Sequence, residues 1–383
     1  MHGFFLRTAV HFDENALSRL SQLEYKKVCI FADPFTVSSG LIKHATKHLD
    51  AAGIQYKIFS DITPDPSINK VAEGVAALMV EKAPCLIAIG GGSAIDLAKS
   101  VRLFAKKMYP DHFPYFIAIP TTSGTGSEVT SFAVVTDTDK GVKHALVDND
   151  LLPDEAILDV EMVKSVPASI TADTGMDVLT HAIEAYVSTG ANTFADLYAA
   201  RSIFLCLEYL VESYKFEKTG NVKAREQMHI ASNLAGIAFN AVGLGINHGM
   251  AHQLGAQLHI PHGRANAILL PHIIEYNAGL TYTNHIDKDS TALKRYAHIA
   301  RKFGVGNYNN IVSVETFVAH IRKMQRDMNV PCRVSAACPK LTREEYMKKI
   351  PAMVEAALKD RCTPTNPRVP KAEELAKIFE KIW

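Results

Sequence analysis

Along the first 165 residues, short apolar runs alternate with helical patterns. The apolar runs are 26–33, 56–62, 84–92, 114–122 and 131–137. Near-continuous apolar strands joined by helices are typical of βαβ units whose parallel sheet is covered on both faces. We therefore expect an α/β domain with a parallel sheet over residues 1–165.

The pattern changes after residue 165, where the strand signal stops. Apolar residues recur at helical spacing in 177–187, 194–214, 226–239 and 292–303. A chain of 383 residues exceeds the size at which single hydrophobic cores stop growing. We expect a second, all-helical domain over 166–383, in contact with the first, and a ligand site in the cleft between them.

Composition and charge exclude several classes of protein. Hydrophobic residues make up 48% of the chain and charged residues 21%, as in soluble globular proteins. The net charge is +1, and Lys and Arg form no basic stripe, so we expect no nucleic-acid partner. The six cysteines form no CxxC pair, which indicates reduced thiols in a cytoplasmic protein. Without a secretory signal or a long apolar run, we expect no membrane partner.

Two glycine-rich segments each follow a predicted strand: GGGS at 90–93 and TTSGTGSE at 121–128. Glycines let the backbone approach a ligand, and the free N–H groups at a helix start favour a phosphate. A glycine-rich turn without a ligand is the alternative for either loop alone. Ligands of open α/β sheets lie at the carboxyl ends of the strands, so the two loops together predict a nucleotide site.

Asp33 ends the first predicted strand of the chain, the apolar run at 26–33. A carboxylate there can accept hydrogen bonds from ribose hydroxyls and would repel a 2′-phosphate, which favours NAD over NADP. The common dinucleotide fingerprint does not carry this inference, because its acidic residue follows the glycines. A plain helix N-cap is the alternative interpretation of Asp33.

Asp177 and His181 lie four residues apart on a predicted helix and so share one face. The apolar residues around them indicate a buried helix, in which a carboxylate needs a cation or strong donors. Alone, such a pair is more often a surface pair or a satisfied core histidine.

The segment 245–272 holds five of the chain's sixteen histidines. His248 and His252 are one helical turn apart, and His262 lies in a predicted turn. Three imidazoles and one carboxylate suit Fe²⁺, Zn²⁺ or another divalent transition metal. The alternative is that two or three of the five serve in packing or at the surface, and we assign His259 and His272 to that class.

Four motifs, in this order, resemble the iron-dependent (group III) alcohol dehydrogenase family. They are GGGSAIDLAK, PTTSGTGSEVT, TGMDVLTHAIEAY and NHGMAHQLGAQLHIPHGRANAILLPHIIEYN. The resemblance covers essentially the whole chain. FSDITPDPSI and DTDKGVKHALVDNDLLPDEAILD are most similar to the propanol and ethanol dehydrogenases of bacterial microcompartments. Lactaldehyde reductases and propanediol dehydrogenases of the family are similar but more distant.

The resemblance implies a dehydroquinate synthase-like architecture, in which a Rossmann-like domain precedes an all-helical metal-binding domain. It implies that Fe²⁺, or Zn²⁺ on the same ligands, is held by Asp177, His181, His248 and His262. It places His252 near the nicotinamide and substrate. Implied NAD contacts are Asp33, Asp65, Gly91, Gly92, Ser93, Thr121, Thr122, Thr125 and Lys143. Relatives often have Asn where this chain has Asp65.

The implied function is reversible hydride transfer between NAD(H) and short primary alcohols or aldehydes, with His252 as proton relay or as a purely positioning residue. The alternatives are a diol dehydrogenase of the same family and a dehydroquinate-synthase-like lyase. Such a lyase needs several Lys and Arg around a polyanion, whereas the metal segments here are mostly Ala, Gly, Leu and Ile. A structural protein with a vestigial loop would have lost a ligand position, and all four are present.

For partners, the resemblance implies a homodimer or higher homo-oligomer. It also implies a cytoplasmic location, with an aldehyde dehydrogenase or a microcompartment shell as partners. No encapsulation-type amphipathic extension precedes the first domain, so we expect packaging to depend on a partner enzyme.

Overall fold

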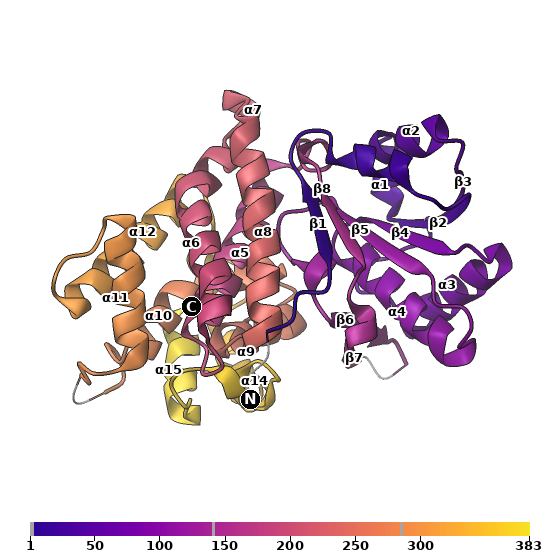
Figure 1. The fold of residues 1–383 in the computed structure, drawn as a ribbon. Coiled ribbons are helices and arrows are strands. Elements are labelled where there is room, and N and C mark those ends of the chain that lie inside the picture. Colours follow the sequence, from indigo (N-terminus) through magenta and orange to yellow (C-terminus); the bar gives the residue numbers. More distant parts are fainter. Residues whose placement is uncertain (1–3, 140–141, 284–285) are drawn as a thin grey trace. The chain divides into compact units, whose positions relative to one another are not determined.

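The computed structural model describes residues 4–139, 142–283 and 286–383 (Figure 1). By internal contacts the chain forms two compact units. The first comprises Met1–Val166 and Val222–Asn240, and the second comprises Pro167–Asn221 and Ala241–Trp383. A helix of the predicted second domain, α8 (Val222–Val242), therefore belongs mostly to the first unit, and the division of the chain at residue 165 is too simple.

The first unit contains a six-stranded sheet in the order β1-β8-β5-β4-β2-β3, and every neighbouring pair is parallel. The strands are β1 (Ala9–Phe12), β2 (Lys27–Ala32), β3 (Gln55–Phe59), β4 (Cys85–Gly90), β5 (Tyr115–Pro120) and β8 (Glu155–Leu158). The predicted parallel α/β fold is thus confirmed. Gly90 pairs with Pro120, so β4 and β5 end at the same edge.

Helices cover both faces of this sheet (Figure 1). They are α1 (Pro34–Ser38), α2 (Lys43–Ala51), α3 (Ile68–Glu81) and α4 (Gly92–Met108), with a 3₁₀ turn at Ala16–Gln22. In β4, Ile87 and Ile89 pack with α2, whereas Leu86 and Ala88 pack with α3 and α4. Because alternate residues enter two cores, the buried strands are apolar throughout, as their sequences indicate.

The run at 131–137 does not join this sheet. It forms β6 (Phe132–Asp137), which pairs antiparallel with β7 (Val142–Val147) in a separate two-stranded sheet. Every residue of β7 is exposed or half-buried. The apolar composition of β6 does not distinguish it from a strand of the main sheet, although the two-stranded sheet buries only one face.

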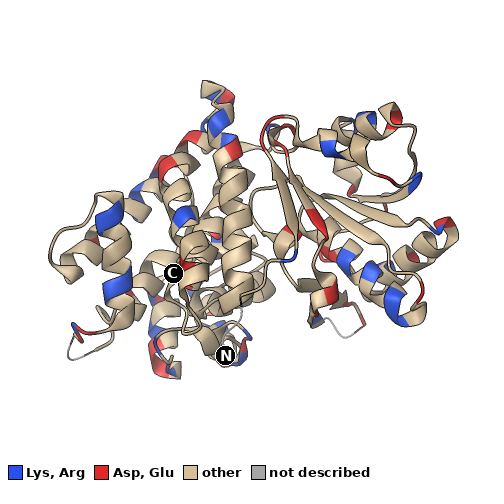
Figure 2. Cartoon of the chain, in the orientation of Figure 1, with Lys and Arg blue, Asp and Glu red and all other residues tan. Residues whose placement is uncertain are grey.

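The second unit is helical, and its described residues contain no strand, which confirms the prediction for this half. Its helices are α5 (Ala168–Val187), α6 (Thr193–Tyr214), α7 (Phe216–Thr219), α9 (Ile246–Leu258), α10 (His262–Asn277), α11 (Thr291–Phe303), α12 (Asn310–Asp327), α13 (Val334–Ala337), α14 (Arg343–Lys359) and α15 (Ala372–Lys381). One core cluster joins α9, α10, α14 and α15. No single helix among the described residues is long and apolar enough to span a membrane, although α8 and α9 taken together reach that length and composition. Along the ribbon, Lys and Arg residues are interspersed with Asp and Glu residues (Figure 2).

Helix α8 joins the first unit through polar residues on one face. Its Asn233 donates to the carboxylate of Glu128 at 3.0 Å, and the Asn240 side-chain oxygen accepts from the Ser131 N–H at 2.8 Å. Gly236 lies against the backbone of Gly126, whose φ is +61°. The helix therefore holds the second glycine loop in place.

We expect Gly236→Ala to lower the free energy of unfolding by about 1–3 kcal/mol, as other overpacked sites do. The new Cβ would lie 2.8 Å from the Gly126 carbonyl oxygen, so the loop backbone must move. Gly255→Ala in α9 is the matched control, because its Cβ meets nothing nearer than 3.6 Å, and it should be neutral or stabilising by up to about 1 kcal/mol. Urea denaturation measures both, and equal losses would contradict the packing argument.

Candidate metal centre and dinucleotide loops

The two glycine loops meet at the carboxyl edge of β4 and β5. The Thr121 N–H donates to the Gly90 carbonyl at 3.0 Å. A Cβ on Gly91 would touch the Thr122 side chain at 3.6 Å, and one on Gly92 would lie 2.8 Å from Cγ2 of Thr125. Glycine at 92 is therefore required by the close approach of the second loop.

Asp33 lies beside this edge, since a Cβ on Gly90 would be 2.7 Å from its Oδ2. Its carboxylate accepts from the Thr36 N–H and from the Thr36 hydroxyl, both at 2.8 Å, so it is also the N-cap of α1. Both interpretations of Asp33 are thus compatible with its position.

Asp65, Ser93 and Lys143 form a third group at this edge. The Asp65 N–H donates to the Ser93 hydroxyl at 3.4 Å, and Lys143 Nζ lies 2.7 Å from an Asp65 carboxylate oxygen. Both charged side chains are more than half exposed. All nine candidate cofactor residues therefore lie around the ends of β2, β4 and β5, and their contact with NAD stays a prediction.

A buried charge on α4 supports the second loop. Lys99 is fully buried and donates to the carbonyls of Thr130 at 2.7 Å and Phe132 at 2.8 Å. Asp96, one turn earlier, accepts from the Ser127 hydroxyl at 2.6 Å. Burial lowers the pKa of Lys99 to about 8 against the pull of the Asp96 carboxylate. These residues stand inside the GGGSAIDLAK motif, but their spacing alone gives no sign of what they hold.

In the second unit, the four predicted metal ligands converge from three helices. Asp177 and His181 come from α5, His248 from α9, and His262 from the first turn of α10. One ligand atom from each lies within 4.8 Å of the others. Asp177 Oδ1 is 3.7 Å from His248 Nε2 and 3.4 Å from His262 Nε2. Three of the four are buried, whereas the His262 side chain is 44% exposed, so the cluster opens on the His262 side.

The charge states of the cluster suit a cation. Burial alone would raise the pKa of Asp177, but the imidazoles of His262, His181 and His248 outweigh it and lower that pKa. Burial lowers the pKa of His181 to about 3, so its imidazole is neutral and offers a lone pair. One ionised carboxylate with three imidazoles fits a divalent transition metal and leaves room for a further ligand.

Two further residues, Glu184 and Asn266, orient the candidate metal ligands. Neither of them was identified from the sequence. Glu184 accepts from the Asn247 N–H at 2.7 Å and pairs with Nδ1 of His248. Asn266 donates to the Asp177 carboxylate at 2.6 Å. Such partners fix ligand orientation in metal sites. For Glu184 a signal existed, because it stands one turn after His181 in a buried helix.

We expect Glu184→Gln to weaken metal binding by about 10–100-fold, the range measured for lost outer partners of ligand histidines. The amide keeps the shape but removes the charge that holds His248. Glu355→Gln, on an exposed carboxylate paired with Lys359, is the control and should bind metal like the wild type. Chelator competition gives the affinities, and equal affinities in the two variants would contradict the role of Glu184.

Metal affinity should rise with pH. Burial alone lowers the pKa of His248, but the carboxylates of Glu184 and Asp177 outweigh it and raise that pKa above its usual value. Below the raised pKa the metal must displace a proton from this ring, so the apparent affinity should increase by about tenfold per pH unit from pH 6 to 8. Fe²⁺ competition with a chelator of known pH dependence, in the absence of oxygen, measures the slope, and a flat profile would show that His248 is not a ligand.

His252 lies next to the cluster but outside it. Its ring centroid is 6.1 Å from that of His248 and 5.5 Å from that of His262. Its Nδ1 is 2.7 Å from a carboxylate oxygen of Asp360. The other two histidines of the segment lie in neither cluster of metal-ligating groups found among the described residues: His259 ends α9 with φ +55°, and burial lowers the pKa of His272 to about 4.

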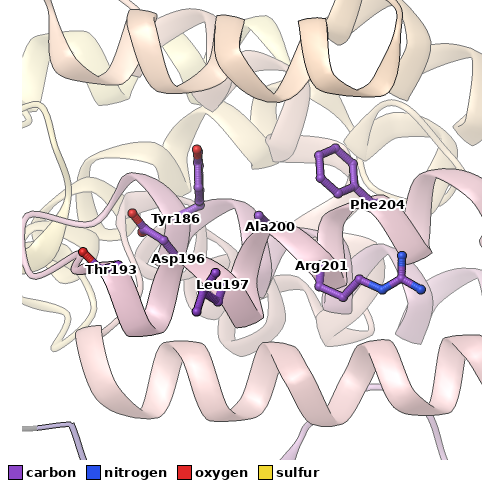
Figure 3. Close-up of a pocket in the computed structure, with 7 residues that line it drawn as sticks. All are labelled: Tyr186, Thr193, Asp196, Leu197, Ala200, Arg201 and Phe204. Carbon is purple, nitrogen blue, oxygen red and sulfur yellow. The ribbon is translucent and has the colours of Figure 1, made fainter.

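A surface pocket of about 430 Å³ is lined by residues of α5 and α6 (Figure 3). Its lining residues are Tyr186, Thr193, Asp196, Leu197, Ala200, Arg201 and Phe204. None of them belongs to the metal cluster or the glycine loops, so the pocket has no part in the candidate site.

Sequence comparison matches both halves of the chain to one family. Residues 8–160 match iron-containing alcohol dehydrogenase, and residues 171–383 match the C-terminal part of the Fe-containing alcohol dehydrogenase family. A 1-propanol dehydrogenase of Citrobacter freundii is 42% identical over the full length of both chains. An NADPH-dependent butanol dehydrogenase of Clostridium saccharobutylicum is 36% identical and covers the whole of this chain and 98% of its own.

Solved structures agree with this assignment. A 1,3-propanediol oxidoreductase superposes with a TM-score of 0.89 at 33% identity, covering all of both chains. A sulfoacetaldehyde reductase from Bifidobacterium kashiwanohense, in complex with NAD+, superposes with a TM-score of 0.86 at 26% identity and covers the whole of this chain and 98% of its own. The chain therefore belongs to the iron-containing alcohol dehydrogenase family.

Proposed function

We propose that the protein is a metal-dependent, NAD(H)-linked enzyme that interconverts short-chain primary alcohols and aldehydes. As a member of this family it is an alcohol–aldehyde oxidoreductase, and the proposal adds the cofactors, the residues and the substrate length. The observation that supports it most directly is the convergence of Asp177, His181, His248 and His262. The likeness to the 1-propanol and butanol dehydrogenases supports substrates of three and four carbons.

These four residues would hold Fe²⁺, and the same donor set suits Zn²⁺. When bound, the ion polarises the substrate oxygen as a Lewis acid, and NAD accepts or returns the hydride. The protein contributes the geometry of the site. Because His262 forms the exposed side of the cluster, the substrate would approach there, next to His252.

His252 would move the proton. An ionised Asp360 only accepts hydrogen bonds, so Nδ1 of His252 donates to it, and Nε2 is left to take or give a proton. The His252 side chain is 37% exposed, which gives the proton access to solvent.

For the cofactor we propose NAD, held by the nine residues at the ends of β2, β4 and β5. The Asp33 carboxylate would repel a 2′-phosphate, and Asp65, which pairs with Lys143, donates its N–H to Ser93 of the first glycine loop. The NAD+ complex of the sulfoacetaldehyde reductase supports this choice, whereas the butanol dehydrogenase is a relative that uses NADPH.

The proposal extends to the protein's surroundings. We propose a cytoplasmic homo-oligomer that works inside a bacterial microcompartment beside an aldehyde dehydrogenase. The resemblance of FSDITPDPSI and the 137–159 segment to microcompartment enzymes supports this. Co-purification of the protein with shell fragments tests it, and its recovery only in the soluble fraction would contradict it.

An activity screen tests the proposed reaction. Metal-free protein is reconstituted with Fe²⁺ or Zn²⁺ and assayed with alcohols, aldehydes and diols of two to four carbons, with NAD and NADP. We expect net NADH formation from 1-propanol or ethanol, with NAD preferred. A preference for 1,3- or 1,2-propanediol would favour the diol dehydrogenase alternative, and no net NADH with any alcohol would favour the lyase.

A further inference from the structure

A second group of metal-ligating side chains lies beside the four candidate ligands. It consists of His252 on α9 with Asp360 and Cys362, which follow α14. One ligand atom of each lies within 4.8 Å of the others. The proposed reaction uses His252 but gives no task to the Cys362 thiol.

The fold holds these three residues in place. One Asp360 oxygen is 2.7 Å from His252 Nδ1, and the other accepts from the Cys362 N–H at 2.8 Å. The Thr363 hydroxyl donates to the Ala357 carbonyl at 2.6 Å, which ties the turn to the end of α14. The same turn packs on α9, since a Cβ on Gly249 would lie 2.6 Å from that hydroxyl oxygen. The donors are therefore preorganised on two elements.

The donor chemistry is that of a zinc site. A thiolate, an imidazole and a carboxylate are the three ligand types that Zn²⁺ takes in proteins, and three of them leave a fourth position open. Burial raises the pKa of the Cys362 thiol, and the Asp360 carboxylate raises it further. A divalent cation would lower the pKa of the Cys362 thiol again, because the thiolate and the Asp360 carboxylate together balance the charge of the cation.

We propose that His252, Asp360 and Cys362 form a second metal site, separate from that of Asp177, which takes a thiophilic divalent cation such as Zn²⁺ or Cd²⁺. On binding, the Cys362 thiol releases its proton to solvent and its sulfur bonds to the cation. The His252 proton moves from Nδ1 to Nε2, so that Nδ1 bonds to the cation. Filling this site would inhibit the enzyme, because Nε2 then carries a fixed proton. The inhibition, unlike the site, rests on the proposed function of His252.

Cadmium titration of the metal-free protein tests the site without any assay of activity. We expect the wild type to bind two Cd²⁺ per chain and to show the ultraviolet charge-transfer band of a cadmium–thiolate bond. His262→Ala should bind one Cd²⁺ and keep the band. Cys362→Ser should bind one and lose it. Cys332→Ser, on an exposed cysteine, is the control and should bind two with the band intact.

A wild type that binds one Cd²⁺, or a Cys362→Ser variant that keeps the band, would overturn the site. The inhibition is tested separately on the iron-loaded enzyme, with each variant's rate normalised to its own rate without added Zn²⁺. Wild-type activity should fall by about 100-fold, the contribution expected of a proton-transferring group, and Cys362→Ser should resist. Equal inhibition of the two would overturn the inhibitory role. If no alcohol is oxidised at all, the proposed function fails while the cadmium result still decides the site.

Discussion

Asp177→Asn should abolish tight Fe²⁺ binding and lower kcat by about a thousandfold or more. The substitution keeps the size of the side chain but removes the one carboxylate of the cluster, which is buried and ionised beside three imidazoles. A Lewis-acid metal contributes several kcal/mol to the transition state, and each 1.36 kcal/mol corresponds to about tenfold in rate. Iron content by mass spectrometry and the rate of NADH formation from 1-propanol measure the two effects.

Asp173→Asn is the matched control. Asp173 stands one turn before Asp177 on the same helix, pairs with Arg264 at 2.9 Å, and lies outside the metal cluster. It should keep one Fe²⁺ per chain. If Asp177→Asn also retained its metal, or if both variants lost it equally, the assignment of Asp177 as a ligand would be wrong.

Lys99→Met should destabilise the first unit by about 3 kcal/mol, because removing one member of a buried charged network leaves its partners unsatisfied. The carbonyls of Thr130 and Phe132 would lose their donor, and the half-buried Asp96 would lose the nearby cation. Since these groups hold the second glycine loop, NADH binding should weaken as well. Urea denaturation and NADH fluorescence report the two effects.

Lys106→Met makes the same substitution two turns later in α4. Lys106 pairs with Asp150 at 2.6 Å, but its side chain is 40% exposed. An exposed pair contributes at most about 1 kcal/mol, so this variant should remain close to the wild type in stability and in NADH binding. Equal losses at the two positions would show that Lys99 has no special role.

The pattern of the chain was sufficient for the buried strands and the long helices. β2, β4 and β5 are apolar throughout because both of their faces are covered, and α5, α6 and α11 keep helical spacing over many residues. β1 and β8 were missed, since four-residue strands give little periodicity to recognise. The pairing of β6 with β7 depends on contacts that composition does not encode.

The metal cluster could be named from sequence only through motifs. The four-residue spacing places Asp177 and His181 on one face, but nothing local brings His248 and His262 to them. Their convergence depends on the packing of α5, α9 and α10. Asp360 and Cys362 lie more than a hundred residues after His252 in the sequence, so only the fold shows that the three side chains lie close together.

Helix α8 illustrates the same limit at the scale of a domain. Its sequence is helical like that of its neighbours, so the change of periodicity at residue 165 assigns it to the second domain. Its Asn233, however, bonds to Glu128 of the second glycine loop, its Asn240 bonds to Ser131 just after that loop, and Gly236 packs on Gly126. Long-range partners of this kind decide where a helix belongs.

The most direct test is stoichiometric reconstitution of the chelated enzyme with Fe²⁺ in the absence of oxygen. The rate of NADH formation from 1-propanol should start near zero, rise linearly with added Fe²⁺, and level off at one ion per chain in the wild type but not in Asp177→Asn. A chelated enzyme that already oxidises 1-propanol at the full rate would contradict the account.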